Sequence, residues 1–194
     1  MFKKIKKLKE LNYEPNVIFD LGAYKGKWTK KMLSIYPNSK YILFEPIMYD
    51  ELNDFNNKNI ECKNILLSDS VKDVDWFQEK NTGDSMFKEK TKHFINTKVI
   101  KKKTNTLDNV FKNHDIFNNK NFFMKIDCQG AEIPILKGAK TLINKIDFII
   151  LELPLFGQYN ENVSNFNEHI KFMDKIGFQI FSKIFNRYKN NFNM

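Results

Sequence analysis

The sequence predicts an α/β fold in which helices cover both faces of a mostly parallel sheet. Strand-like apolar runs alternate with helix-like runs from about residue 16 to 185, and successive strand–helix–strand units make the strands parallel. At 194 residues the chain has the length of one ordinary domain. We therefore expect a single domain over residues 1–194, with a basic N-terminal segment (1–15), a core (16–185) and a tail (186–194).

The first part of the core is predicted to contain three buried strands separated by helices. Each strand is a short apolar run that ends at a polar residue, a pattern typical of buried strands. The intervening helix has apolar residues at helical spacing and ends at a proline-containing stop after residue 36. The expected strands are 17–20, 41–44 and 62–67, and the expected helices are 28–36 and 50–55.

The second part begins with two less apolar runs, 73–78 and 98–103, which we expect to be paired strands joined by a polar loop. Regular alternation then resumes. Pro134 falls in the first turn of a predicted helix, where its missing N–H costs little. The remaining expected elements are helices at 106–113, 131–143 and 166–176 and strands at 122–126, 146–151 and 178–185.

Composition excludes several classes of protein. A hydrophobic share of 42% and a charged share of 28% are those of a soluble globular protein. The longest apolar run, 148–156, contains Glu152, so we expect no membrane span. Residues 1–9 are basic but are followed by no apolar core or cleavage site, so we expect a cytoplasmic protein with no secretory signal. Two cysteines and three histidines without ligand spacing predict no zinc cluster.

The formal charge of +9 raises nucleic acid as a partner. However, 31 of the 32 basic residues are Lys and one, Arg187, is Arg. Proteins that read phosphates and base edges rely on the planar, bidentate guanidinium group. We therefore rank nucleic acid behind a small-molecule partner.

Carboxylates lie at or next to the end of each predicted strand of the parallel sheet. In open parallel sheets, ligands bind outside the carboxyl ends of the strands, where the strand order reverses. A buried strand end has no structural need for an acidic residue, so we expect these side chains to line a ligand site. They are Asp20, Glu45, Asp69 (after Ser68), Asp127 and Glu152.

The turn after the first strand distinguishes two classes of nucleotide site. A dinucleotide fingerprint that begins at Gly22 requires glycine at positions 24 and 27, where this chain has Tyr24 and Lys27. The second glycine lets the backbone approach a pyrophosphate. The turn that remains, residues 20–23 with Gly26, enters a helix N-terminus and suits a carboxylate and a sugar.

The next two strand ends extend this argument. Glu45 follows Gly26 by 19 residues, where a carboxylate can accept from both hydroxyls of a ribose. Asp69 is then placed to accept from an adenine amino group. A cofactor with adenine, ribose, an amino-acid end and no phosphate is S-adenosylmethionine. The predicted cofactor-binding residues are Asp20, Gly22, Ala23, Gly26, Glu45, Ser68 and Asp69.

One block is more specific than composition explains: residues 125–132 read K-I-D-C-Q-G-A-E, followed by L-K-G at 136–138. With the glycine turn, L-F-E-P at 43–46 and L-S-D at 67–69, the chain resembles the FkbM-type S-adenosylmethionine-dependent methyltransferases over about residues 16–180. The resemblance implies a class I methyltransferase (Rossmann-like) sheet. It also implies O-methylation, often of sugars and other secondary metabolites.

Two departures from the family pattern affect what we expect. The family often has Asn at the position of Tyr24, which is a cofactor contact in that pattern. Family members commonly finish with a longer hairpin, whereas this sequence ends at Met194. We therefore expect the final strand to be short or missing.

The cofactor suggests the catalytic residues. Methyl transfer from a sulfonium is an in-line displacement, so positioning does much of the work, and a hydroxyl acceptor must also lose a proton. Asp127 is the candidate base, with Glu132 and Glu152 orienting the substrate or raising the pKa of the base. The alternative is that Asp127 and Glu152 hold a divalent metal that polarises the hydroxyl. The favoured prediction assigns no residue to a metal.

The predicted function is S-adenosylmethionine-dependent O-methylation of a small hydroxylated acceptor, with a sugar, glycan precursor or secondary metabolite favoured. Two alternatives remain open: a nucleic-acid (RNA) methyltransferase, and a catalytically silent S-adenosylmethionine-binding protein. Nucleic-acid enzymes that methylate amino groups usually have an Asn/Asp-Pro-Pro-aromatic motif where this chain has residues 127–130. We expect loops 83–96 and 156–165 to form the acceptor pocket.

Overall fold

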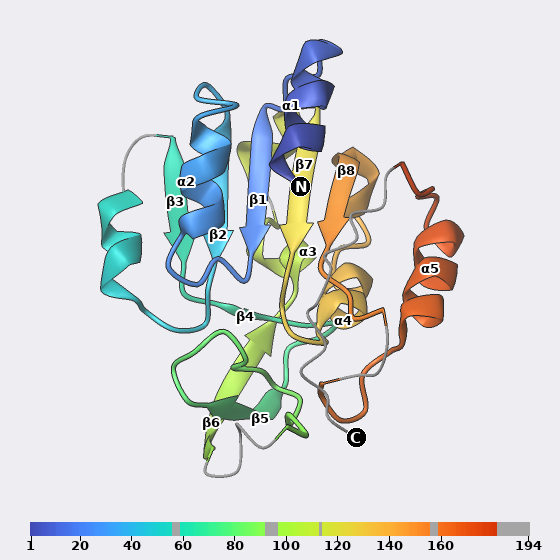
Figure 1. Cartoon of the computed structure of the whole chain (residues 1–194). Helices are drawn as coiled ribbons and strands as arrows, with labels where there is room; N and C mark the ends of the chain where they lie inside the picture. The colour runs from blue at the N-terminus through green and yellow to red at the C-terminus, as the bar shows by residue number, and fades with distance from the viewer. Residues whose placement is uncertain (56–58, 92–96, 113, 156–158, 182–194) are drawn as a thin grey trace, which may run out of the picture.

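The computed structural model is built around a five-stranded parallel sheet (Figure 1). It describes residues 1–55, 59–91, 97–112, 114–155 and 159–181. The strand order is β3-β2-β1-β7-β8. The chain adds strands on one side of β1 and then on the other, so the order of the parallel strands switches between β1 and β7, as in doubly wound α/β folds. The predicted mostly parallel α/β fold is therefore confirmed. The strands are β1 (Val17–Leu21), β2 (Lys40–Phe44), β3 (Ile60–Lys63), β7 (Phe122–Ile126) and β8 (Ile146–Leu151).

One face of the sheet is covered by α1 (Phe2–Glu10) and α2 (Lys27–Leu33) (Figure 1). The basic N-terminal segment therefore forms a helix, because Ile5 and Leu8 recur at helical spacing and are buried. The 3-10 helix η1 (Asp50–Phe55) adds to the same apolar cluster. Its buried members include Ile5, Leu8, Ile18, Trp28, Met32, Leu43, Phe55 and Phe123.

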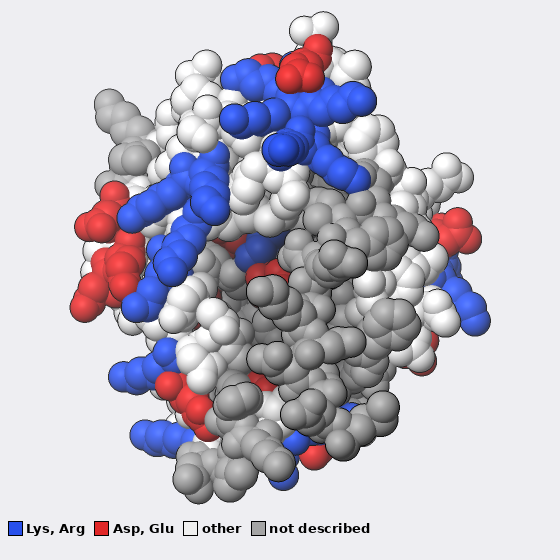
Figure 2. Space-filling view, viewed as in Figure 1, with Lys and Arg blue, Asp and Glu red and all other residues white. Residues whose placement is uncertain are grey.

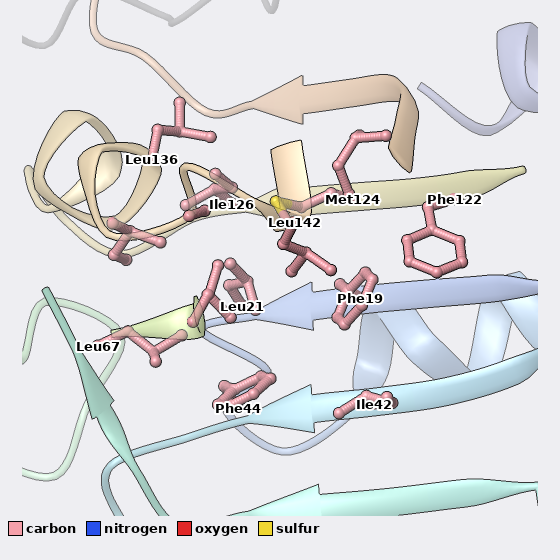
Figure 3. Close-up of a cluster of buried hydrophobic side chains, with 14 of the residues drawn as sticks. Phe19, Leu21, Ile42, Phe44, Leu67, Phe122, Met124, Ile126, Leu136 and Leu142 are labelled. Carbon is pink, nitrogen blue, oxygen red and sulfur yellow. The ribbon is translucent and has the colours of Figure 1, made fainter. Parts of the chain in front are cut away.

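The opposite face carries the larger apolar cluster, because alternate residues of each strand point to opposite sides of the sheet. Figure 3 shows Phe19, Leu21, Met124 and Ile126 of β1 and β7 packed with Leu136 and Leu142. Phe172 and Met173 also pack against this cluster. The elements on this side are α3 (Leu107–Val110), η3 (Asp115–Asn118), α4 (Glu132–Lys137), η4 (Leu142–Lys145) and α5 (Phe166–Lys175).

A second, small sheet lies beyond the carboxyl ends of the parallel strands (Figure 1). It has the order β4-β6-β5 and consists of β4 (Leu66–Leu67), β5 (Asp73–Gln78) and β6 (Lys98–Asn105). β5 and β6 are antiparallel, so the expected pairing of these two segments is confirmed. None of the described helices is long and apolar enough to cross a membrane.

Several predicted elements differ from the structure, and three of the differences change the fold's description. The strand expected at 62–67 is two strands, because a turn after Lys63 sends β4 into the small sheet. The helix expected at 131–143 ends at Lys137, and the chain then enters η4. Of the strand expected at 178–185, residues 178–181 are not in a strand, and the rest lies outside the described residues.

Gly138 lies at the end of α4, where the helix packs closely on two other segments. A Cβ atom at this position would lie 2.3 Å from the carbonyl oxygen of Ser68 and 3.1 Å from Cβ of Thr106. The carbonyl of Gly138 also accepts a hydrogen bond from the N–H of Asp108. The glycine of the L-K-G motif therefore lets the end of α4 pack directly on the segment after β4.

We predict that Gly138→Ala lowers the free energy of unfolding by about 1–3 kcal/mol, because the added methyl group overpacks a site bounded by backbone. The φ angle of Gly138 is −84°, so steric contact alone produces the effect. Urea denaturation measures it. The matched control, Lys137→Ala, changes an exposed neighbour and should stay within about 0.5 kcal/mol of the wild type. Equal stability of the two variants would contradict the packing argument.

Candidate functional site

A cavity of about 330 Å³ lies between the carboxyl ends of the parallel strands and the small sheet. This volume is within the range of small-molecule sites. In Figure 2 a hollow near the centre of the face shows acidic and basic side chains at its base. The polar lining includes Glu45, Asp84, Asp127, Gln129 and Glu152, and the apolar lining includes Phe44, Ile65, Leu66, Leu67, Trp76, Met86 and Ile135.

Behind the cavity, a buried ion pair joins β1 to β7. Asp20 and Lys125 are paired in register on these strands, and Lys125 Nζ lies 3.1 Å from Asp20 Oδ1. Thr29 donates a 2.6 Å hydrogen bond to the other carboxylate oxygen. Lys125 also donates to the carbonyl of Gly22 at 2.8 Å and lies 3.5 Å from Asp127. Asp20 is fully buried and does not line the cavity, so it organises the site from behind.

The Lys125 ammonium stays charged despite its burial. Desolvation opposes the charged form, but the carboxylates of Asp20 and Asp127 outweigh it and raise the pKa of Lys125 above its ordinary value. The ammonium is therefore a fixed cation at the junction of the two central strands.

The glycine turn after β1 is shaped mainly by close packing. A Cβ at Gly22 would lie 2.0 Å from the carbonyl oxygen of Asp127, and one at Gly26 would lie 2.3 Å from the Phe55 ring. Both glycines have positive φ angles, 74° and 70°. Of the predicted residues in this turn, Gly22 lines the cavity, whereas Ala23 and Gly26 are buried beside it.

Glu45 is a buried carboxylate at the end of β2 that faces the cavity. Its Oε2 accepts a hydrogen bond from the N–H of Tyr24 at 2.8 Å, and its Oε1 accepts from the N–H of Ile47 at 3.1 Å. Burial raises the pKa of Glu45 to about 7, against the effect of these two hydrogen bonds. A carboxylate has further lone pairs, so Glu45 can still accept hydrogen bonds from a ligand.

Ser68 and Asp69 lie outside the cavity that other predicted carboxylates line. Because β3 ends at Lys63, the chain reaches them through the small sheet. Asp69 instead accepts hydrogen bonds from Lys72 at 2.7 Å and Ser70 at 2.9 Å, and the bond from Lys72 lowers its pKa. Neither Ser68 nor Asp69 lines the cavity, whose wall is formed there by residues 65–67.

Asp127 and Glu152, at the ends of β7 and β8, form a carboxyl pair in the cavity. The charge of Asp127 raises the pKa of Glu152, and partial burial and a side-chain hydrogen bond between the two groups act in the same direction. Gln129 donates to Asp127 Oδ1 at 3.2 Å. Glu152 is therefore easier to protonate than an isolated glutamate, because the charge of Asp127 lies beside it.

Glu132 acts on the backbone of the loop after β7. It is buried in the first turn of α4, and its Oε1 accepts from the N–H groups of Cys128 at 3.1 Å and Gly130 at 3.2 Å. Its Oε2 lies 3.8 Å from Nε2 of the buried His169 in α5. Burial opposes the charge on His169, but the nearby carboxylate of Glu132 and the contact with the carbonyl of Asn165 outweigh it and raise the pKa of His169. Glu132 does not line the cavity, so it can shape the Asp127 loop without facing a substrate.

The loop between β5 and β6 forms a wall of the cavity through Asn81, Thr82, Asp84 and Met86. Asp84 accepts hydrogen bonds from the N–H groups of residues 79–81 and so fixes the turn. The loop is tied to its surroundings as well. Ser85 donates to the carbonyl of Gln129 at 2.8 Å, and the segments 88–90 and 159–161 exchange backbone hydrogen bonds. The described parts of the two loops expected to form the acceptor pocket therefore lie side by side.

Sequence reasoning missed several residues of the cavity wall. Tyr24 and Tyr49 contact each other at 4.9 Å between ring centroids, and Trp76 adds a third aromatic ring to the lining. The departure from the family pattern at Tyr24 was the one available signal. Trp76 lies in a strand whose alternation indicates a half-exposed sheet, and nothing in its sequence context points to a cavity.

A cavity at the carboxyl ends of a doubly wound parallel sheet defines a Rossmann-like ligand-binding domain. Residues 20–180 match the model of the Methyltransferase FkbM domain. The chain therefore belongs to the FkbM methyltransferase family, as its motifs predicted.

The chain is also similar to the crystal structure of methyltransferase FkbM from Methylobacillus flagellatus KT, with a TM-score of 0.43 and 15% identity. The similarity covers 69% of this chain and 32% of that chain, so this chain spans less than two thirds of that protein. Comparison with curated proteins finds no match.

We predict that Lys125→Met lowers the free energy of unfolding by about 3–5 kcal/mol, because it leaves the charge of Asp20 buried without its partner. Adding Asp20→Asn should recover at least about 1 kcal/mol, since the two residues interact directly. Denaturant titration of both variants measures this coupling. Lys140→Met, at an exposed site, is the control. Additive effects of the two substitutions would show that the ion pair is not the source of the loss.

Proposed function

We propose that this protein transfers a methyl group from S-adenosylmethionine to a hydroxyl of a small acceptor, with a sugar or glycan precursor favoured. The observation that carries the proposal is the Asp127–Glu152 carboxyl pair in the same cavity as the buried Glu45. Family membership supports methyl transfer. The carboxyl pair supports a hydroxyl acceptor, because such an acceptor has to give up a proton.

The residues present fit the proposed cofactor. Glu45 is buried with a raised pKa, and ribose hydroxyls would supply hydrogen-bond donors to it. Ile65, Leu66 and Trp76 offer an apolar wall suited to an adenine ring. The carboxylates of the lining complement the positive sulfonium and ammonium groups. When bound, the cofactor supplies the methyl group that is transferred.

The chain's own residues then handle the acceptor and its proton. Asp127 would accept the proton that the acceptor hydroxyl loses when it is methylated. Gln129 holds Asp127 through the 3.2 Å hydrogen bond to Oδ1. Glu152 lies beside Asp127, whose charge raises the pKa of Glu152. Among the described residues, no group of three or more His, Cys, Asp or Glu side chains is arranged to hold a metal ion.

We predict stoichiometric binding of S-adenosylhomocysteine by the wild type, measured by calorimetric titration, and its loss in Glu45→Ala. Affinity should fall as the pH drops below about 7, because protonated Glu45 accepts fewer hydrogen bonds. Glu61→Ala is the control, since Glu61 lies on the neighbouring strand β3 and outside the cavity lining. Binding of NADH in its place, or no binding by folded protein, would refute the cofactor assignment.

We predict that Asp127→Asn lowers turnover about 10²–10⁴-fold with a hydroxylated acceptor while S-adenosylhomocysteine still binds, because the amide cannot take up the proton. Transfer of a labelled methyl group to a panel of sugars and nucleotide sugars measures turnover. Asp75→Asn, on the exposed side of the small sheet, is the matched control. Unchanged turnover in Asp127→Asn would rule out Asp127 as the base.

A further inference from the structure

The exposed surfaces of α1 and α2 form a basic surface. We define it by the exposed side chains of Lys3, Lys6, Lys7, Lys27, Lys30 and Lys31. Figure 2 shows basic side chains gathered over these two helices. The helices are in contact, because Phe2 packs near Trp28 with 6.5 Å between ring centroids and Lys31 lies over the Phe2 ring. The six charges therefore belong to one continuous patch.

The two helices that carry this surface account for most of the chain's excess of positive charge. α1 and α2 together contain eight lysines and one acidic residue, Glu10, which gives a net +7 out of the formal +9 of the chain. In the part of the chain that the structure describes, none of the six lysines of the basic surface lies within ion-pair distance of a carboxylate. Elsewhere lysines are matched, as in the pairs Lys72–Asp69 and Lys101–Asp75.

Folding does not require this concentration of charge. The buried sides of the two helices supply the packing, through Ile5 and Leu8 in α1 and Trp28 and Met32 in α2. Six like charges on adjacent helices repel one another, which costs stability. An anionic partner that lies across both helices offsets this repulsion.

The side chains around the patch indicate which anion fits. All its cations are lysines, which act as point charges and lack the bidentate geometry that reads nucleic-acid bases. Exposed apolar side chains lie at the two ends of α1, where Met1 is the N-cap at 40% exposure and Leu11 is the C-cap at 63% exposure. Apolar groups beside lysines gain free energy in the boundary between lipid headgroups and acyl chains, whereas a sugar–phosphate backbone offers them no such environment.

We propose that the basic surface docks the protein reversibly on an anionic phospholipid bilayer. α1 lies at the end of the sheet opposite the small sheet (Figure 1), and the cavity lies at the carboxyl ends of the strands. α2 begins at Lys27, shortly after the turn at the carboxyl end of β1 that contains the cavity residue Gly22. The lysines of α1 are therefore the part of the basic surface that lies farther from the cavity. This contact is peripheral and needs no spanning segment, and it is independent of the proposed methyl transfer.

The test uses co-sedimentation of the full chain with vesicles of phosphatidylcholine containing about a third phosphatidylglycerol, against pure phosphatidylcholine. We expect binding to the anionic vesicles alone, and its loss when salt is raised from about 0.15 M to about 1 M, which shortens the Debye length from about 8 to about 3 Å. Each lysine near the surface is worth about a fivefold change in partitioning, so replacing three lowers it about a hundredfold.

Two triple variants test the contribution of each helix to vesicle binding. They are Lys3→Ala/Lys6→Ala/Lys7→Ala in α1 and Lys27→Ala/Lys30→Ala/Lys31→Ala in α2. Alanine preserves the helices, and circular dichroism verifies folding. The control, Lys120→Ala/Lys140→Ala/Lys175→Ala, removes the same charge from exposed sites elsewhere and should bind nearly as the wild type does.

Three outcomes would overturn the proposal. The first is no binding of the wild type to anionic vesicles. The second is partitioning that stays unchanged in either triple variant or falls equally in the control. The third is binding of a single-stranded polynucleotide that is tighter than binding of the anionic vesicles under the same conditions. That result would assign the surface to nucleic acid.

Discussion

A single buried cation holds the two central strands at the point where the site begins. Lys125 reaches the carboxylate of Asp20, the carbonyl of Gly22 and the side chain of Asp127. These groups come from the ends of β1 and β7 and from the loops that follow them. Without the ammonium, two carboxylates and a carbonyl would face one another in a poorly solvated space, and their repulsion would separate the strand ends. The close approach of the Gly22 and Asp127 backbones therefore depends on this charge.

The loop that carries Asp127 is constrained from a second side. Glu132 binds the N–H groups of Cys128 and Gly130, and His169 lies against the same carboxylate from α5. α5 begins with a capping box formed by Asn165 and Glu168, so the position of His169 is fixed by its own helix. A helix remote in sequence thus contributes to the shape of the loop through one buried carboxylate.

Much of the site was predictable because parallel strands end at one edge of the sheet. Asp20, Glu45, Asp127 and Glu152 were placed from this rule alone, and the structure puts three of them in one cavity and the fourth directly behind it. Asp69 was misplaced because the rule assumes that each apolar run is one strand. Residues 60–67 contain a turn after Lys63, and the alternation of side chains does not distinguish one long strand from two short ones in different sheets.

Other features depended on contacts that sequence patterns do not encode. Glu132 was predicted to orient the substrate or to raise the pKa of Asp127. Its contacts in the structure are with backbone N–H groups and with His169, which lies 37 positions further along the chain. The cavity wall formed by Tyr24, Tyr49 and Trp76 combines three separate segments. Such surfaces arise when a loop and a sheet insertion pack over a common edge, and no local spacing predicts them.

Charge is divided between the interior and the exterior of the molecule. The chain is strongly basic overall, yet the titratable groups that line the cavity include the four carboxyl groups of Glu45, Asp84, Asp127 and Glu152. Lys125 offsets part of this negative charge from behind the wall. Because the cavity is partly shielded from solvent, its charges act at lower dielectric than the lysines outside. The interior therefore favours a cationic ligand such as a sulfonium, while the exposed surfaces of α1 and α2 favour anions.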